Sequence, residues 1–172
     1  MRFLLAVFVF SLILNGSVLS EQKIVFVDME KLINASKTGS SMSSQLKDIN
    51  NKDLSFLKKE GEKFKEKEKK LIAQKNIINE EDFKKKVEEL KSEINNYNQK
   101  RKQMIKKFNK LKVENTNSLL KLINPILTKF SNENEISIIL QKKNLIIGKK
   151  ELDITDEIIE IINNEIKEFK IK

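Results

Sequence analysis

The chain has 172 residues, with 34 Lys and Arg against 25 Asp and Glu, so its formal charge is +9. It contains no Cys and no His, which removes the usual ligands of zinc and the usual thiol and imidazole groups of catalysis. We therefore predict that the protein is not an enzyme and that it has no catalytic site, no cofactor and no metal. One Pro and four Gly favour long helices over a fold of many strands and turns.

The basic excess is almost entirely lysine, because Arg2 and Arg101 are the two arginines. Arginine is the side chain best suited to bidentate recognition of bases and phosphates, and the chain has no nucleic-acid-binding motif. We therefore expect no nucleic-acid partner. Three interpretations of the charge stay open: it solvates helices, steers acidic partners, or attracts an anionic lipid surface.

Residues 1–20 have the pattern of an export signal. Arg2 precedes an apolar run from Phe3 to Leu14, and small and turn-forming residues follow up to Ser20. The alternative is a buried or membrane-spanning helix, but a comfortable span needs about 20 apolar residues. We therefore expect a signal peptide that is cleaved near Ser20, so that the mature chain starts near Glu21.

The first elements expected after the signal are a strand and a short helix. Residues 23–27 are β-branched or aromatic apart from Lys23, which predicts a strand. Asp28 follows and can cap the turn of helix that 29–33 suggest. Residues 36–44 are small and include Gly39, so this stretch is either a loop or a frayed entry into the next helix.

Two long helices are predicted in the middle of the chain, at 46–115. In the first, one strong apolar residue recurs every seven positions, at Leu57, Phe64, Leu71 and Ile78. The second has a fuller heptad pattern, interrupted by Arg101, Asn115 and Ser118, with its apolar positions at Phe83, Val87, Leu90, Ile94, Tyr97, Met104, Phe108, Leu111 and Leu122. Asn79 is a candidate helix cap, and the break at 77–79 is short, so we predict an antiparallel coiled-coil hairpin.

The net charge of the chain is concentrated on this hairpin. Residues 46–112 hold 21 Lys and Arg against 12 Asp and Glu, which equals the net +9 of the whole chain. The remaining residues are therefore close to neutral. A long, two-helix projection with this charge favours long-range attraction of acidic partners.

The last part of the chain is predicted to hold more helix and two strands. The second long helix continues past Pro125, and 136–140 and 145–147 are apolar strands joined by a hairpin-length loop. Thr155 is a candidate cap of a final amphipathic helix, whose apolar residues are Ile158, Ile159, Ile161, Ile162, Ile166 and Phe169. Three short strands with almost no polar face cannot form a stable monomeric sheet, so we predict a homo-oligomer.

Three segments together resemble the Skp/OmpH family of periplasmic chaperones. They are KIVFVDMEKLIN at 23–34, ISIILQKKNLII at 136–147 and ELDITDEIIEIIN at 151–163, with the charged hairpin between the first two. The resemblance implies an α+β, mostly α fold, in which the hairpin arm (46–115) projects from a small β body (21–45 and 116–172). It also implies that the body assembles into a trimer.

The resemblance implies a function as well. A member of this family is an ATP-independent holdase, which binds unfolded outer-membrane proteins in a cavity between its arms in the periplasm. The residues implied for the oligomerising body are Ile24, Phe26, Ile138, Leu140 and Ile146. The residues implied for client contact are Phe64, Leu71, Ile72, Ile77, Ile78, Phe83 and Val87.

Two alternatives stay open from the residues themselves. The apolar residues of the arm can pair with each other across the helix seam, which is compatible with client contact if the helices are only partly zipped. The chain can also be a secreted structural coiled-coil protein, a spacer that dimerises through its heptads and has no chaperone activity.

Overall fold

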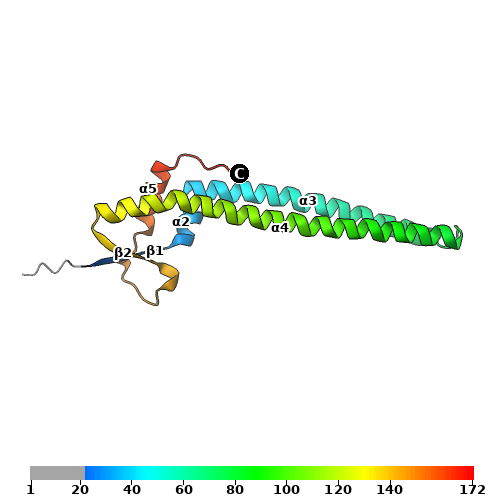
Figure 1. Cartoon of the computed structure of the whole chain (residues 1–172), viewed down its shortest axis with the longest axis horizontal. Helices are drawn as coiled ribbons and strands as arrows, with labels where there is room; N and C mark the ends of the chain where they lie inside the picture. Colours follow the sequence, from blue (N-terminus) through cyan, green and yellow to red (C-terminus); the bar gives the residue numbers. More distant parts are fainter. Residues whose placement is uncertain (1–21) are drawn as a thin grey trace, which may run out of the picture.

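A computed structural model describes residues 22–172, and the predicted export signal at 1–20 lies outside these residues. The chain is mostly helical with a small sheet, as the sequence predicted, and Figure 1 shows two long helices that extend from a cluster of short elements. In chain order the elements are β1 (Lys23–Val27), α2 (Met29–Ala35), α3 (Lys37–Gln74), α4 (Glu80–Glu133), β2 (Ile136–Gln141), the 3-10 turns η1 (Lys142–Asn144) and η2 (Lys150–Leu152), and α5 (Thr155–Glu165).

The helices α3 and α4 lie side by side and run in opposite directions (Figure 1). Their contacts follow this arrangement, because Lys67 pairs with Glu93 while the hydroxyl of Tyr97 donates a hydrogen bond to the Leu57 carbonyl at 2.9 Å. We call residues 46–115 the arm, and the remaining described residues, 22–45 and 116–172, the body. Both long helices extend beyond the arm into the body.

The turn at the tip of the arm, residues 75–79, ends in a helix cap. The side chain of Asn79 accepts a hydrogen bond from the backbone N–H of Asp82 at 2.8 Å, which confirms the predicted cap. Three acidic residues occupy the first turn of α4, where negative charge interacts favourably with the positive end of the helix dipole. The local sequence therefore determines where the second long helix begins.

The sheet of the body contains β1 and β2 in parallel orientation, with Ile24 opposite Ile138 and Phe26 opposite Leu140. Parallel strands need a long crossover, which α2, α3 and α4 provide here. Because side chains alternate along a strand, Val25 and Val27 point to the other face, where they are buried. That face covers a core shared with α2, α4 and α5, whose fully buried members are Leu32, Leu119, Ile123, Ile158 and Ile162.

A hydrogen-bond network links the end of β1 to the start of α5. Asp28 caps α2 as predicted, accepting from the N–H of Lys31 at 2.9 Å. Its own N–H donates to the hydroxyl of Thr155 at 2.9 Å, and that hydroxyl donates to Asp153. The prediction that Thr155 caps α5 is wrong, because its hydroxyl is occupied by these two partners and Ile154 holds the cap position.

The predicted strand at 145–147 does not form. After β2 the chain makes a 3-10 turn, closed by a hydrogen bond from the N–H of Leu145 to the carbonyl of Lys142 at 3.0 Å. This turn directs the chain away from β2, so no hairpin is made. Ile146 is left 99% exposed, and Ile147 nearly as much. Strand propensity alone was insufficient, because the connecting turn must also bring the chain back along the free edge of β2.

The final helix is shorter than predicted, because α5 ends at Glu165 and not near Phe169. Ile166 has an extended backbone, and residues 166–172 run back over the first turns of α3 without regular secondary structure (Figure 1). Phe169 is nevertheless buried in the core. Its spacing from α5 fitted a helix, but its burial comes from the folding back of this segment, which we call the tail.

The apolar stripe of α4 changes register at Asn115. The predicted seam residue Leu122 is 46% exposed, whereas Asn115, expected to interrupt the seam, is 3% exposed. Beyond Asn115 the buried residues of α4 are Leu119, Ile123, Ile126 and Phe130. The stripe shifts because α4 packs there against α5 and β2. Pro125 lies inside α4, which continues through it as predicted.

Candidate binding surface on the arm and the sheet

The arm presents lysine side chains to solvent along most of its length. Four ion pairs of the arm use exposed or half-exposed side chains, joining Lys63 to Glu60, Lys67 to Glu93, Lys91 to Glu88 and Lys110 to Glu114. The hydrogen bond from Lys63 lowers the pKa of Glu60 from its usual value. Because Lys and Arg together outnumber Asp and Glu by nine over 46–112, these pairs leave a net positive surface that attracts acidic groups.

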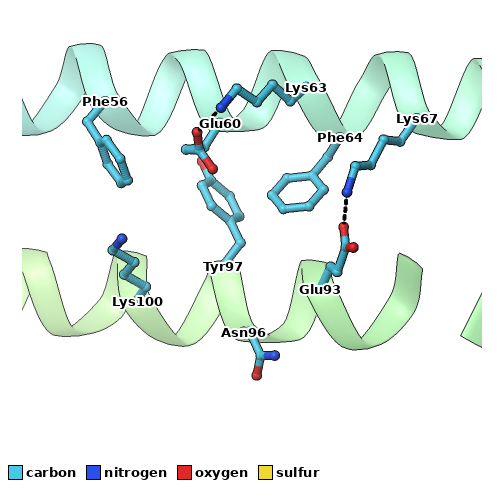
Figure 2. A pocket seen from close by; sticks show the side chains of 9 residues that line it. All are labelled: Phe56, Glu60, Lys63, Phe64, Lys67, Glu93, Asn96, Tyr97 and Lys100. Atoms are coloured by element: carbon cyan, nitrogen blue, oxygen red, sulfur yellow. Dashed lines mark hydrogen bonds and ion pairs between the residues drawn. The ribbon is translucent and has the colours of Figure 1, made fainter. Parts of the chain in front are cut away.

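A pocket of about 410 Å³ lies between α3 and α4 partway along the arm. Figure 2 shows Tyr97 of α4 between Phe56 and Phe64 of α3. The rings of Phe64 and Tyr97 are tilted, with centroids 5.3 Å apart. Gly61 of α3 lies beside Tyr97, and an added Cβ there would make an ordinary contact of 3.4 Å with the Tyr97 hydroxyl.

Lysines surround these aromatic rings. The ammonium of Lys100 lies 4.3 Å from the centre of the Phe56 ring, and that of Lys67 lies 5.8 Å from the centre of the Phe64 ring. Such cation–π contacts hold each lysine over an apolar surface while its charge stays in water. The pocket therefore offers apolar area and positive charge together, a combination that fits a polypeptide with both apolar and acidic side chains.

The seven residues predicted to contact a client divide into two groups. Five are half-buried: Phe64, Leu71, Ile78, Phe83 and Val87. Ile72 and Ile77 are 63% and 79% exposed near the tip. The contact between α3 and α4 therefore covers the five half-buried side chains only in part, and it leaves Ile72 and Ile77 accessible to another molecule.

Other apolar residues that face water on the arm carry no predicted role. They are Leu54, Phe56, Ile105 and Val113. Phe56 is the clearest omission, because it lines the pocket and sits next to Leu57, which satisfies the heptad pattern. A search for aromatic residues outside the heptad register would have found it.

The outer face of the sheet is apolar and open. Ile24, Ile138 and Leu140 are exposed on it, whereas Phe26 is covered by the chain at Gly148, where an added Cβ would meet the ring at 2.6 Å. Ile146 lies in the exposed loop after β2. Four of the five residues predicted for oligomerisation are therefore solvent-accessible in the single chain. A contiguous apolar surface of this kind usually marks an interface.

Potential metal ligands do not cluster within residues 22–172. This part of the chain holds no group of three or more acidic, His or Cys side chains that could bind a metal. No helix in the same range is both long and apolar enough to cross a membrane. The surfaces described above are suited to binding other polypeptides.

Comparisons with known proteins agree with this description. A family model for outer membrane proteins of the OmpH-like type matches residues 23–162. A solved structure from Caulobacter crescentus, described as an outer membrane chaperone (OmpH-like), has a TM-score of 0.72 at 18% sequence identity. The match covers 87% of this chain and 88% of that chain. No curated protein matches the sequence.

Proposed function

Because the chain belongs to the OmpH-like family, a periplasmic chaperone family, we propose that it is an ATP-independent holdase for unfolded outer-membrane proteins. The observation that carries the proposal is the arm surface, where apolar side chains and lysines lie together without forming a closed core. Many weak contacts of this kind hold an unfolded chain without fixing one conformation. Release then needs no nucleotide, since each contact is weak and exchanges rapidly.

The proposal includes assembly of the body. The exposed outer face of the sheet, with Ile24, Ile138 and Leu140, is covered by other copies of the chain, and the Ile146 loop contributes to the same contact. Three copies then form one body, and their arms surround a cavity. Burial of apolar area, at about 25 cal/mol per Å², drives this association.

The basic charge of the arm has a kinetic role in this proposal. Long-range attraction between lysines and acidic groups raises the rate of encounter more than it raises final affinity. Capture of an acidic client should therefore slow at high salt, whereas the final amount held changes less. An anionic lipid surface attracts the same lysines, so vesicles of anionic lipid serve as a competitor in the assay.

The test is a light-scattering assay in which a urea-denatured porin is diluted into buffer with and without the protein. We expect less aggregation when the mature chain is present. The double variant Ile72→Ser/Ile77→Ser should weaken this suppression about twofold or more, because both side chains offer exposed apolar area to the client. The matched control Val113→Ser removes an exposed apolar residue outside the predicted client set and should suppress normally.

Aggregation that is unchanged by the wild-type chain would contradict the holdase and favour the spacer interpretation. Equal loss of suppression in the double variant and in Val113→Ser would mean that the tip residues have no special role.

A further inference from the structure

Hydrogen bonds to its backbone hold the tail at the site formed by Gln45 and Asn115, where α3 and α4 pass from the arm into the body, and we call this site the root of the arm. The side-chain amide of Gln45 on α3 donates to the Phe169 carbonyl at 2.8 Å and accepts from the Ile171 N–H at 3.3 Å. The amide of Asn115 on α4 donates to the Lys172 carbonyl at 3.5 Å and accepts from the Lys172 N–H at 3.2 Å. Each long helix therefore contributes one amide that uses both its donor and its acceptor on the tail backbone.

Over residues 168–172 the side chains of the tail alternate between water and the core. Phe169 is buried and Ile171 is partly buried against the core, whereas Glu168, Lys170 and Lys172 are exposed. The two outward residues Glu168 and Lys170 pair with each other at 3.4 Å. The root of the arm thus recognises a backbone and two apolar side chains, two positions apart.

The buried amide of Asn115 depends on the tail for part of its hydrogen bonding. Its side chain is 3% exposed, and a buried amide that lacks partners is costly. The Leu111 carbonyl accepts one hydrogen bond from it at 2.8 Å, and the tail satisfies the rest. A leucine would suit the heptad seam better at this position. The break in the seam at Asn115 therefore exists where the tail is bound.

We propose that the root of the arm is a binding site for extended polypeptide segments with apolar side chains at alternate positions, and that the tail is its internal, displaceable occupant. Recognition through backbone hydrogen bonds and alternate apolar pockets tolerates many sequences. Outer-membrane β-strands have this alternation. The inference rests on the proposed function for the identity of the natural ligand, a segment of an unfolded client.

The tail restricts access to the site through its covalent connection. A short linker gives an internal ligand an effective concentration in the millimolar range. A single external segment therefore competes poorly, whereas a client that is already held at many points along the arms also has a high local concentration. The tail would then release the site only to a client that the arms have captured.

The test measures binding of a fluorescent synthetic peptide copying residues 166–172 to full-length variants. In Phe169→Ser/Ile171→Ser the tail loses its apolar anchors, so the peptide should bind about tenfold or more tightly than to the wild type. Adding Gln45→Ala and Asn115→Ala should abolish the gain. The matched control Glu168→Ser/Lys170→Ser changes outward residues only and should bind as the wild type does. A peptide with serine at the two apolar positions should not bind.

Equal binding to the wild type and to the tail variant, or binding to neither, would overturn the inference. If the tail variant Phe169→Ser/Ile171→Ser loses its helical circular dichroism, hydrogen exchange of the wild-type chain tests the inference in its place. Excess unfolded porin should speed exchange of the Ile171 and Lys172 amides, and unchanged exchange would contradict a displaceable tail. If the peptide binds but the protein does not suppress porin aggregation, the proposed holdase function is rejected and the site at the root of the arm is kept. If the protein suppresses aggregation but neither peptide binding nor faster exchange is seen, this site is rejected and the holdase function is kept.

Discussion

At the scale of single residues, the corner between α2 and α3 depends on Gly39. Ser36 occupies the cap position of α3 and accepts a hydrogen bond from the Gly39 N–H at 3.1 Å. A Cβ on Gly39 would lie 1.6 Å from the carbonyl oxygen of Ile33, inside van der Waals contact. The backbone of α2 occupies that space, so a side chain there cannot be accommodated by rotation of a neighbour.

Gly39→Ala should therefore destabilise the body strongly. We expect a loss in the free energy of unfolding on the order of 3 kcal/mol or more, because the backbone must shift. Urea unfolding followed by circular dichroism, at a fixed protein concentration, measures it. Ser40→Ala, the exposed neighbour on the same helix, is the control and should change stability little. Equal stability of the two variants would show that the corner is adaptable.

A second residue-scale prediction concerns pH. Burial favours a raised pKa for Asp153, but hydrogen bonds from Lys142 and Thr155 outweigh it and hold the pKa below its usual value of 3.8. A carboxylate with a depressed folded pKa contributes stability above its unfolded pKa, and the contribution is lost as pH falls through the folded pKa. Asp153→Asn should therefore cost about 1 kcal/mol at pH 7 and progressively less below pH 3.8.

Urea titrations at neutral and acidic pH check this expectation. Asp156→Asn is the control, because that side chain is largely exposed and its ion pair with Lys31 lies at the surface. A cost for Asp153→Asn that stays constant down to strongly acidic pH would mean that the carboxylate charge contributes nothing.

At the scale of elements, the arm contains a weak point at Gly61 in the middle of α3. Glycine in a helix interior costs about 1 kcal/mol relative to alanine. An added Cβ would make an ordinary contact of 3.4 Å with the Tyr97 hydroxyl, so space is available. The glycine therefore adds flexibility to the arm beside the aromatic pocket.

Gly61→Ala should stabilise the arm by about 0.5–1 kcal/mol. Hydrogen exchange of the amides of α3 around this position should slow by the corresponding factor. Ser55→Gly, at an exposed position on the same helix, is the matched control and should speed exchange. Faster exchange in Gly61→Ala would contradict the proposed available space and point to a clash with Tyr97.

Helix and strand boundaries were predictable from the sequence where residues close in the chain determine them. The strand 23–27 and the caps at Asp28 and Asn79 depend on neighbouring residues, and all three are confirmed. The strand at 145–147 did not form, because the turn at 142–144 directs the chain away from the free edge of β2. Phe169 was placed in a helix, since its spacing cannot distinguish a helical face from a segment that folds back.

The candidate site was predictable only in part for the same reason. Heptad spacing located Phe64 and Tyr97 on the two arm helices, but Phe56 lies outside the register and gave no periodic signal. Asn115 was recognised as an interruption, whereas its function as a tail contact depends on residues far away in sequence. Exposure of Ile72 and Ile77 also depends on how the two helices meet, which heptad counting does not determine.

At the scale of the whole molecule, the projecting arm and the net positive charge coincide. The arm projects from the body (Figure 1). The body contains the shared core, whereas the arm carries the net positive charge. One arm alone cannot enclose a client. Assembly through the outer face of the sheet would place several arms around one space, so the proposed holding of clients depends on the proposed oligomer.

The molar mass of residues 21–172, the chain expected after removal of the predicted signal, in sedimentation at micromolar concentration tests this dependence most directly. We expect three times the mass of one chain, and the mass of one chain for Ile138→Asp/Leu140→Asp, which introduces charge on the exposed face of the sheet. A dimer would favour the spacer. A wild-type chain that sediments as a monomer at these concentrations would contradict the account.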